Sequence, residues 1–213
     1  MKKVLIALFA FFISTTAWCQ DSRKIKLKDI GTIIFPVAPT SEVQGDDTLY
    51  AVRYNSVTYL ATAAYAQKSI NELLTEHILD SIYNDLIQGA LEPMQGKLLL
   101  RKKITLNGAE GVSFAFKGQI KGSPYYGYNQ SFYLNNTLID YGIITPDSLK
   151  ADDKVLTDFF GSFKLIIKPD EVRQSNVDDV SYGAGYLIGK GLFILTICLI
   201  GLGIVFLIRR FTR

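Results

Sequence analysis

Side chains that could do chemistry are few in this sequence, and they do not form a recognisable catalytic set. His77 is the only histidine, and the two cysteines, Cys19 and Cys198, lie near opposite ends of the chain. Catalysis by histidine needs a nucleophile or an acid within hydrogen-bond reach, and no serine stands in a strained Gly-x-Ser-x-Gly turn. We therefore interpret His77 as a packing or surface residue and expect no enzyme activity; a hydrolase without a familiar motif is the alternative.

Carboxylates occur in adjacent pairs at 46–47, 152–153 and 178–179. None of the pairs has the alternating oxygen ligands of a calcium loop, and adjacent side chains in a strand or helix point apart. Asp152 and Asp153 more simply favour the N-terminus of a helix through its dipole. We expect no metal site and no cofactor.

A basic cluster falls on a predicted strand, at Lys97, Arg101, Lys102 and Lys103. Such a cluster is typical of a solvated strand face, and it is also able to dock an anionic partner or lipid headgroups. Arg101 and Lys103 are therefore candidates for a partner surface.

Four tyrosines follow in the next predicted strand, Tyr125, Tyr126, Tyr128 and Tyr133. Strand alternation places Tyr126 and Tyr128 on one face and Tyr125 and Tyr133 on the other. Tyrosine is both a common strand former and a favoured anchor in recognition surfaces. Tyr125, Tyr126 and Tyr128 are accordingly either sheet packing or part of a partner surface.

A run of 18 uncharged residues, 191–208, is the longest apolar segment. As a helix it would span about 27 Å, close to the hydrocarbon thickness of a bilayer. Three arginines follow it and only Lys190 precedes it, as the positive-inside rule expects for a cytoplasmic C-terminus. We predict a transmembrane helix over 186–208 and a cytoplasmic tail over 209–213; a buried core helix is the alternative.

The first residues predict export. Lys2 and Lys3 precede an apolar run over 4–13 and the small residues Ala17 and Cys19, which is the pattern of a cleavable signal peptide over 1–19. Acylation of Cys19 and an uncleaved signal anchor are the alternatives. We expect a single-pass protein of a bacterial cell membrane, with its N-terminal domain outside the cytoplasm.

Close helix packing is a further possibility within and beside the apolar run. Gly185 and Gly189, and also Gly201 and Gly203, would let another helix approach closely.

Charge offers no sign of a nucleic-acid partner. Six of the 23 Lys and Arg residues lie in the terminal segments, and 23 less six leaves 17 against 20 Asp and Glu in the remainder. The expected extracytoplasmic part is therefore slightly acidic, which disfavours nucleic acid. It also lacks cysteine, and therefore any disulfide framework.

Residues 20–167 predict one α+β domain, in which an antiparallel sheet is flanked by two helices. Alternating apolar residues and turn signals indicate strands at 30–35, 48–54, 57–65, 97–106, 111–117, 125–134, 137–144 and 163–167. Three of the strand pairs are predicted hairpins, with turns at 55–56, 107–108 and 135–136. Helical spacing indicates one helix from Ser69 to Leu91, with Gly89 and Pro93 marking its end, and another over 148–160; Ser69 and Glu72 form a capping box. Residues 40–47 read as a loop, and 168–185 as a polar tether to the membrane.

This order of elements resembles the PsbP-like domains, which include DcrB-like bacterial lipoproteins. The residues that carry the resemblance are Phe35-Pro36-x-x-Pro39, Asn107-Gly108-x-x-Gly111 and Phe159-Phe160-x-Ser162-Phe163. The resemblance implies an antiparallel sheet flanked by helices, used mostly as a non-catalytic binding or assembly module. The transmembrane helix departs from the usual soluble or lipid-anchored members.

We accordingly expect a membrane-anchored, non-catalytic binding or assembly module, with the lipid bilayer and a protein as its partners. The alternative is a small accessory subunit of a membrane complex, held through its transmembrane helix.

Overall fold

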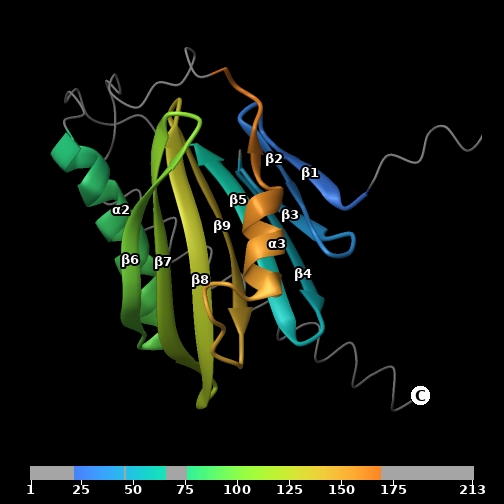
Figure 1. Ribbon diagram of the computed structural model, residues 1–213, viewed down its shortest axis with the longest axis vertical. Coiled ribbons are helices and arrows are strands. Elements are labelled where there is room, and N and C mark those ends of the chain that lie inside the picture. Colours follow the sequence, from blue (N-terminus) through green and yellow to red (C-terminus); the bar gives the residue numbers. More distant parts are fainter. Residues whose placement is uncertain (1–21, 46, 66–75, 169–213) are drawn as a thin grey trace, which may run out of the picture.

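The structure, a computed structural model, describes residues 22–45, 47–65 and 76–168 (Figure 1). A seven-stranded antiparallel sheet with the order β3-β4-β5-β9-β8-β7-β6 runs through the middle, and a small sheet has the order β1-β2-β10. The strands of the large sheet are β3 (Thr40–Gln44), β4 (Asp47–Tyr54), β5 (Val57–Tyr65), β6 (Lys97–Leu106), β7 (Ala109–Ile120), β8 (Ser123–Leu134) and β9 (Thr137–Thr145). The small sheet consists of β1 (Lys24–Leu27), β2 (Gly31–Ile34) and β10 (Lys164–Leu165).

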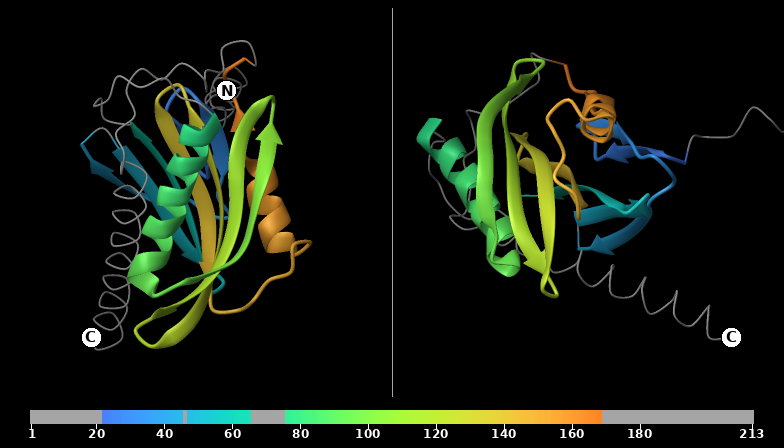
Figure 2. Two further views of the ribbon diagram at one scale, coloured as in Figure 1. Left: turned by 90° about the vertical axis from the view of Figure 1, so that its left-hand side faces the viewer. Right: turned by 60° about the horizontal axis from the view of Figure 1, so that its bottom comes forward.

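Two α-helices lie on opposite faces of the large sheet in the part of the chain that is described. Helix α2 (Glu76–Leu91) covers one face, and α3 (Lys154–Ser162) covers the other together with the small sheet (Figure 2). This arrangement confirms the predicted α+β class, with an antiparallel sheet between two helices.

The two faces of the sheet bury two separate apolar cores. On the α3 side, rings pack edge to face around Phe159, whose centroid lies 5.1 Å from that of Tyr59 and 5.5 Å from that of Phe35. On the α2 side, Leu86 and Ile87 pack with the strand residues that alternate toward them. Strand alternation therefore gives each helix its own apolar surface.

The hairpin predictions are confirmed, and their turns explain why. Asn55–Ser56, Asn107–Gly108 and Asn135–Asn136 all have positive φ at both positions, as does Lys121–Gly122. Two-residue turns of this kind match the right-handed twist of the strands they join, and they favour Asn and Gly. The sequence Asn-Gly was therefore a sound local signal.

Two strands were missed because each lies at the edge of its sheet. The predicted loop 40–47 contains β3, which pairs only with β4 and exposes Val43 to 68%. The charged start contains β1, in which Leu27 is fully buried against the core while Lys24 and Lys26 are not. An edge strand needs little apolar sequence, because much of its surface meets water.

Helix α2 ends at Leu91, as predicted, and a 3₁₀ turn follows at Glu92–Met94, where Met94 is buried. The start of the other helix differs from the prediction. Helix α3 begins at Lys154 rather than Ser148, with the Asp153 carboxylate accepting a hydrogen bond from the Val155 amide at 2.9 Å. The interpretation of Asp153 as a helix N-terminal residue is confirmed.

No helix within 22–45, 47–65 and 76–168 is long and apolar enough to cross a bilayer. The predicted signal peptide with Cys19, the capping box at Ser69 and the tether lie outside the described residues. The predicted transmembrane segment and the four glycines proposed for helix packing, Gly185, Gly189, Gly201 and Gly203, also lie outside them.

Candidate functional site

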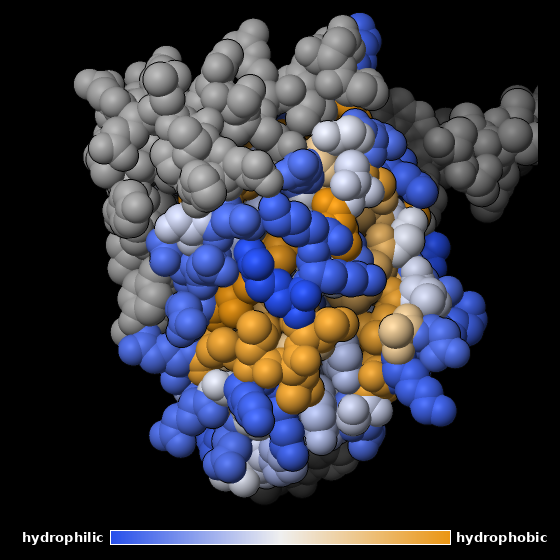
Figure 3. All heavy atoms as spheres, turned by 60° about the vertical axis from the view of Figure 1, so that its left-hand side comes forward, coloured by the Kyte–Doolittle hydropathy of each residue, from blue (hydrophilic) through white to orange (hydrophobic). Residues whose placement is uncertain are grey.

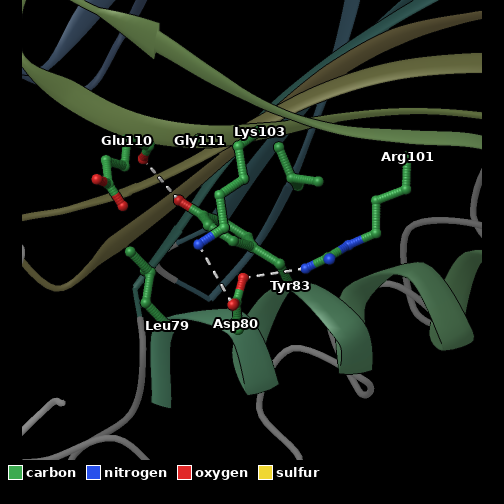
Figure 4. A pocket seen from close by; sticks show the side chains of 8 residues that line it. Leu79, Asp80, Tyr83, Arg101, Lys103, Glu110 and Gly111 are labelled. Carbon is green, nitrogen blue, oxygen red and sulfur yellow. Dashed lines mark hydrogen bonds and ion pairs between the residues drawn. The ribbon is translucent and has the colours of Figure 1, made fainter. Parts of the chain in front are cut away.

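Helix α2 meets the edge of the sheet through an acidic residue that bridges two cations. Asp80 on α2 forms ion pairs with Arg101 Nη2 at 3.1 Å and with Lys103 Nζ at 3.4 Å (Figure 4). Arg101 and Lys103 lie two residues apart on β6, so strand alternation puts both side chains on the α2 face. Two of the predicted partner-surface cations are thus already paired within the molecule.

Tyr83, one helical turn after Asp80, anchors the same helix more deeply. Its hydroxyl donates a hydrogen bond to the Glu110 carbonyl oxygen at 2.9 Å and accepts one from the Tyr133 amide at 3.1 Å. Burial raises the pKa of the Tyr83 hydroxyl well above its usual range. This hydroxyl is therefore a structural group rather than a proton donor to a substrate.

A shallow pocket opens between these residues. Its lining includes Leu79, Asp80, Tyr83, Arg101 and Lys103, and it encloses about 260 Å³ with its open mouth included. Sites for small organic ligands are usually larger, at roughly 300–1,000 Å³. The pocket is suited to water or to the end of one side chain.

The polar groups of this pocket are already engaged in ion pairs and hydrogen bonds. The Asp80 carboxylate is ion-paired with two side-chain cations, and the Tyr83 hydroxyl donates one hydrogen bond and accepts another. A candidate nucleophile with an adjacent base, as covalent catalysis needs, does not occur among the lining residues.

The predicted aromatic surface is divided between the two faces of the sheet. Tyr125 packs against the core on the α2 side, and Tyr133 belongs to that core. Tyr128 packs on the α3 side, where its hydroxyl accepts from the Leu149 amide at 2.7 Å and donates to the Leu149 carbonyl oxygen at 3.1 Å. The predicted alternation is confirmed, and it separates Tyr128 from Tyr125, Arg101 and Lys103.

Tyr126 is half-buried, like Tyr128. It lies opposite Lys117 in the β7–β8 register, and the Lys117 ammonium stands 5.6 Å from the Tyr126 ring centroid. The Tyr128 hydroxyl, in contrast, is hydrogen-bonded to the Leu149 backbone in the segment before α3.

A second polar cluster lies within the large sheet, on the α2 side. The Asp140 carboxylate accepts hydrogen bonds from Ser131 Oγ and from Asn129 Nδ2, the latter at 3.0 Å. Burial raises the pKa of Asp140 to about 6, although both hydrogen bonds act to lower it. No histidine or cysteine joins this group among the described residues, so we interpret it as a structural network.

Metal-ligating residues do not gather anywhere in the described ranges: no group of three or more His, Cys, Asp or Glu side chains is placed to hold an ion. His77 falls within α2, and its side-chain surroundings lie outside what the structure describes.

The feature that the sequence analysis missed is an apolar patch beside the pocket, which we call the leucine patch: Leu98, Leu99 and Leu100. Their exposed fractions are 36%, 52% and 52%. In the sequence they read as an ordinary buried strand. The signal that could have revealed them is the lack of alternation in Leu-Leu-Leu followed directly by Arg-Lys-Lys.

The fold defines the class of protein as an α+β domain built on an antiparallel sheet. No family model matches the chain, and no curated protein matches it.

Solved structures with a partly similar chain path have little sequence in common with this one. The cyanobacterial PsbP protein CyanoP from Synechocystis sp. PCC 6803 aligns at 12% identity and a TM-score of 0.47, over 66% of this chain and 89% of that one. A protein from Bacteroides thetaiotaomicron VPI-5482 aligns at 10% identity and a TM-score of 0.41, over 68% of this chain and 49% of that one. PA94, a protein of unknown function from Pseudomonas aeruginosa, aligns at 12% identity and a TM-score of 0.37, over 57% of this chain and 81% of that one. Likenesses this slight carry no function across.

Proposed function

We propose that this protein is a membrane-anchored extracytoplasmic binding or assembly module with a PsbP-like fold, which binds its partner through an exposed surface. Its signal peptide would export the α+β domain, and the apolar run 191–208 would keep that domain at the membrane.

The observation that carries this proposal is where the described residues put their accessible apolar area. The pocket beside α2 is too small for a typical ligand, whereas eight large apolar side chains are exposed, three of them consecutive on β6. Exposed apolar clusters bordered by polar residues are typical of interaction surfaces. Among the described residues, the exposed apolar side chains therefore support recognition by a surface better than recognition within this pocket.

Tethering gives such a surface its advantage. A domain held at the membrane meets membrane-bound partners at a high effective concentration, so a modest affinity is enough. A protein partner in the same membrane is the partner class that this arrangement suits.

The alternative function, an accessory subunit held through its membrane helix, rests on the spacing of Gly185, Gly189, Gly201 and Gly203. In that case the α+β domain would be a cap, and the transmembrane segment would carry the recognition.

Cross-linked capture from native membranes distinguishes these two functions. The full-length protein is compared with a form that ends after Ser181 and is exported in soluble form. We expect both forms to capture the same protein. Capture that requires residues 185–208 would contradict the proposal and favour the accessory subunit.

A further inference from the structure

The open edge strand β6 carries an apolar patch in an unusual backbone setting. Its register with β7 passes from Leu98 opposite Phe116 to Leu100 opposite Ala115, so Leu99 forms a bulge without a partner residue. The bulge turns Leu98 to the α2 face and Leu100 to the α3 face. All three leucines consequently surround one stretch of the edge instead of alternating into a core.

Cations border this leucine patch on both sides along the strand. Lys97 precedes it and stands opposite Lys117 in the register, and Arg101, Lys102 and Lys103 follow it. Strand β6 contains no acidic residue, and Lys97, Lys102 and Lys117 are exposed. Figure 3 shows an apolar area with a strongly hydrophilic area directly above it on this side of the molecule. We call the leucine patch with Lys97, Arg101, Lys102, Lys103 and Lys117 the β6 surface.

Asp80 limits the charge of the β6 surface without removing it. It pairs with Arg101 and Lys103, whose side chains nevertheless remain 30% and 55% exposed. The remaining three lysines keep the surface positive, although the predicted extracytoplasmic part as a whole is slightly acidic.

The same features make β6 a poor template for another β-strand. Bulges and lysines on an edge strand are the devices by which proteins prevent edge-to-edge pairing. A partner that forms no backbone hydrogen bonds with β6, but presents anionic groups above an apolar layer, suits the β6 surface better. A bilayer with anionic headgroups has this layout, since leucine enters the boundary of headgroups and acyl chains while lysine contacts the phosphates.

The chain itself would bring such a bilayer within reach. The described residues end at 168 and the predicted transmembrane helix begins at 186, which leaves the 17 residues 169–185 as the predicted tether. A random coil of that length reaches about 23 Å. This step rests on the proposed membrane anchor.

We propose that the β6 surface docks the domain onto an anionic lipid bilayer. Leu98, Leu99 and Leu100 insert at the headgroup boundary, and Lys97, Lys102 and Lys117 bind lipid phosphates. The domain then lies against the membrane with β6 toward the lipid, and the opposite edge strand β3 faces away.

Hydrogen exchange on the full-length protein in lipid nanodiscs tests this orientation. One set of discs contains phosphatidylglycerol and phosphatidylcholine in equal parts, and the other contains phosphatidylcholine alone. We expect the amides of residues 97–103 to exchange about 5-fold more slowly in the anionic discs, and those of 40–44 to be unchanged. Equal exchange of 97–103 in both sets would overturn the proposal.

Variants separate the apolar and the ionic contributions. Changing Leu98, Leu99 and Leu100 to Ser should abolish the protection, whereas Val43→Ser on the opposite edge should retain it. Changing Lys97, Lys102 and Lys117 to Gln tests the charge alone in a protein whose apolar contacts are intact, and it should also abolish the protection. Asp80→Asn should strengthen it, because Arg101 and Lys103 lose their internal counter-ion.

Two further outcomes are distinct. Protection of 97–103 that rises with protein concentration in lipid-free micelles would show pairing between two copies and would overturn lipid docking.

Failure of the chain to co-elute with discs would contradict the anchor in the proposed function. Flotation of the same chain with phosphatidylglycerol vesicles then tests the β6 surface, which should bind them and not phosphatidylcholine vesicles; equal binding to both overturns it.

Discussion

The hydroxyl of Tyr83 in helix α2 donates a hydrogen bond to the backbone carbonyl oxygen of Glu110 in strand β7, over 2.9 Å. The same hydroxyl accepts one from the Tyr133 amide in β8, just beyond the first paired residues, Gly111 and Phe132. A helix side chain thus continues the connection between two strands where their direct register ends. It also fixes α2 on the sheet, close to the Asp80 ion pairs.

Replacing Tyr83 with Phe should destabilise the domain by about 1–3 kcal/mol, because the buried Tyr133 amide and the partly buried Glu110 carbonyl each lose a partner. The free energy of unfolding, measured with urea in detergent micelles, checks this. Tyr54→Phe is the matched control: Tyr54 is 42% exposed, and its variant should lie within about 0.5 kcal/mol of wild type. A Tyr83 variant as stable as the control would show that the bridge contributes nothing.

Gly127 in β8 faces the ring of Phe116 across the strand pair, and a Cβ atom there would overlap that ring. We expect Gly127→Ala to cost about 1–3 kcal/mol, because the tightly packed ring must shift. Gly161→Ala in α3 serves as the control. Apart from its chain neighbours and the backbone of its own helix, nothing lies within 4 Å of its added Cβ, so this variant should be neutral or slightly more stable. The midpoint temperature of thermal unfolding should fall for Gly127→Ala and should stay the same or rise slightly for Gly161→Ala.

Asp140 should make stability fall as pH rises. Its folded-state pKa of about 6 lies above the pKa of 3.8 of an aspartate in water, so the native state binds the proton more tightly than the unfolded chain. The free energy of unfolding should therefore fall by about 1–2 kcal/mol between about pH 4 and pH 6, a range that allows for partial solvent access to the carboxyl. Above pH 6 it should level off.

Asp140→Asn should remove this decrease and leave the protein more stable than wild type at neutral pH. Denaturant unfolding at several pH values measures the difference between the two proteins. The exposed Asp152→Asn variant should keep the wild-type profile. If Asp140→Asn also keeps it, the carboxyl is not the group that titrates.

The surface-recognition proposal rests on eight exposed apolar side chains, and three of these, the leucine patch, also carry the lipid-docking proposal. Protection of β6 by anionic lipid would leave the β3 edge and the small sheet available for a protein partner. Loss of lipid docking in the leucine variant, with capture of the protein partner unchanged, would show that the two surfaces act independently.

Much of the domain could be predicted from the sequence. The hairpins around residues 55–56, 107–108 and 135–136 followed from Asn and Gly, because their preference for positive φ acts within two residues. The amphipathic spacing of α2 and the alternation of Tyr125 and Tyr128 were equally local. The start of α3 was not predicted; before it, the Leu149 backbone is hydrogen-bonded to Tyr128, which lies 21 residues away in the sequence.

Local sequence thus specifies the antiparallel pairs, the two helices and the existence of a basic cluster on one strand. Only the tertiary structure decides that β6 is an edge strand, because the burial of a strand depends on which distant segment lies beside it. The assembled structure exposes Leu98, Leu99 and Leu100 and pairs Arg101 and Lys103 with Asp80. It also places the tyrosines on two different faces of the sheet. The surface on which our proposals rest is therefore a property of the assembled sheet.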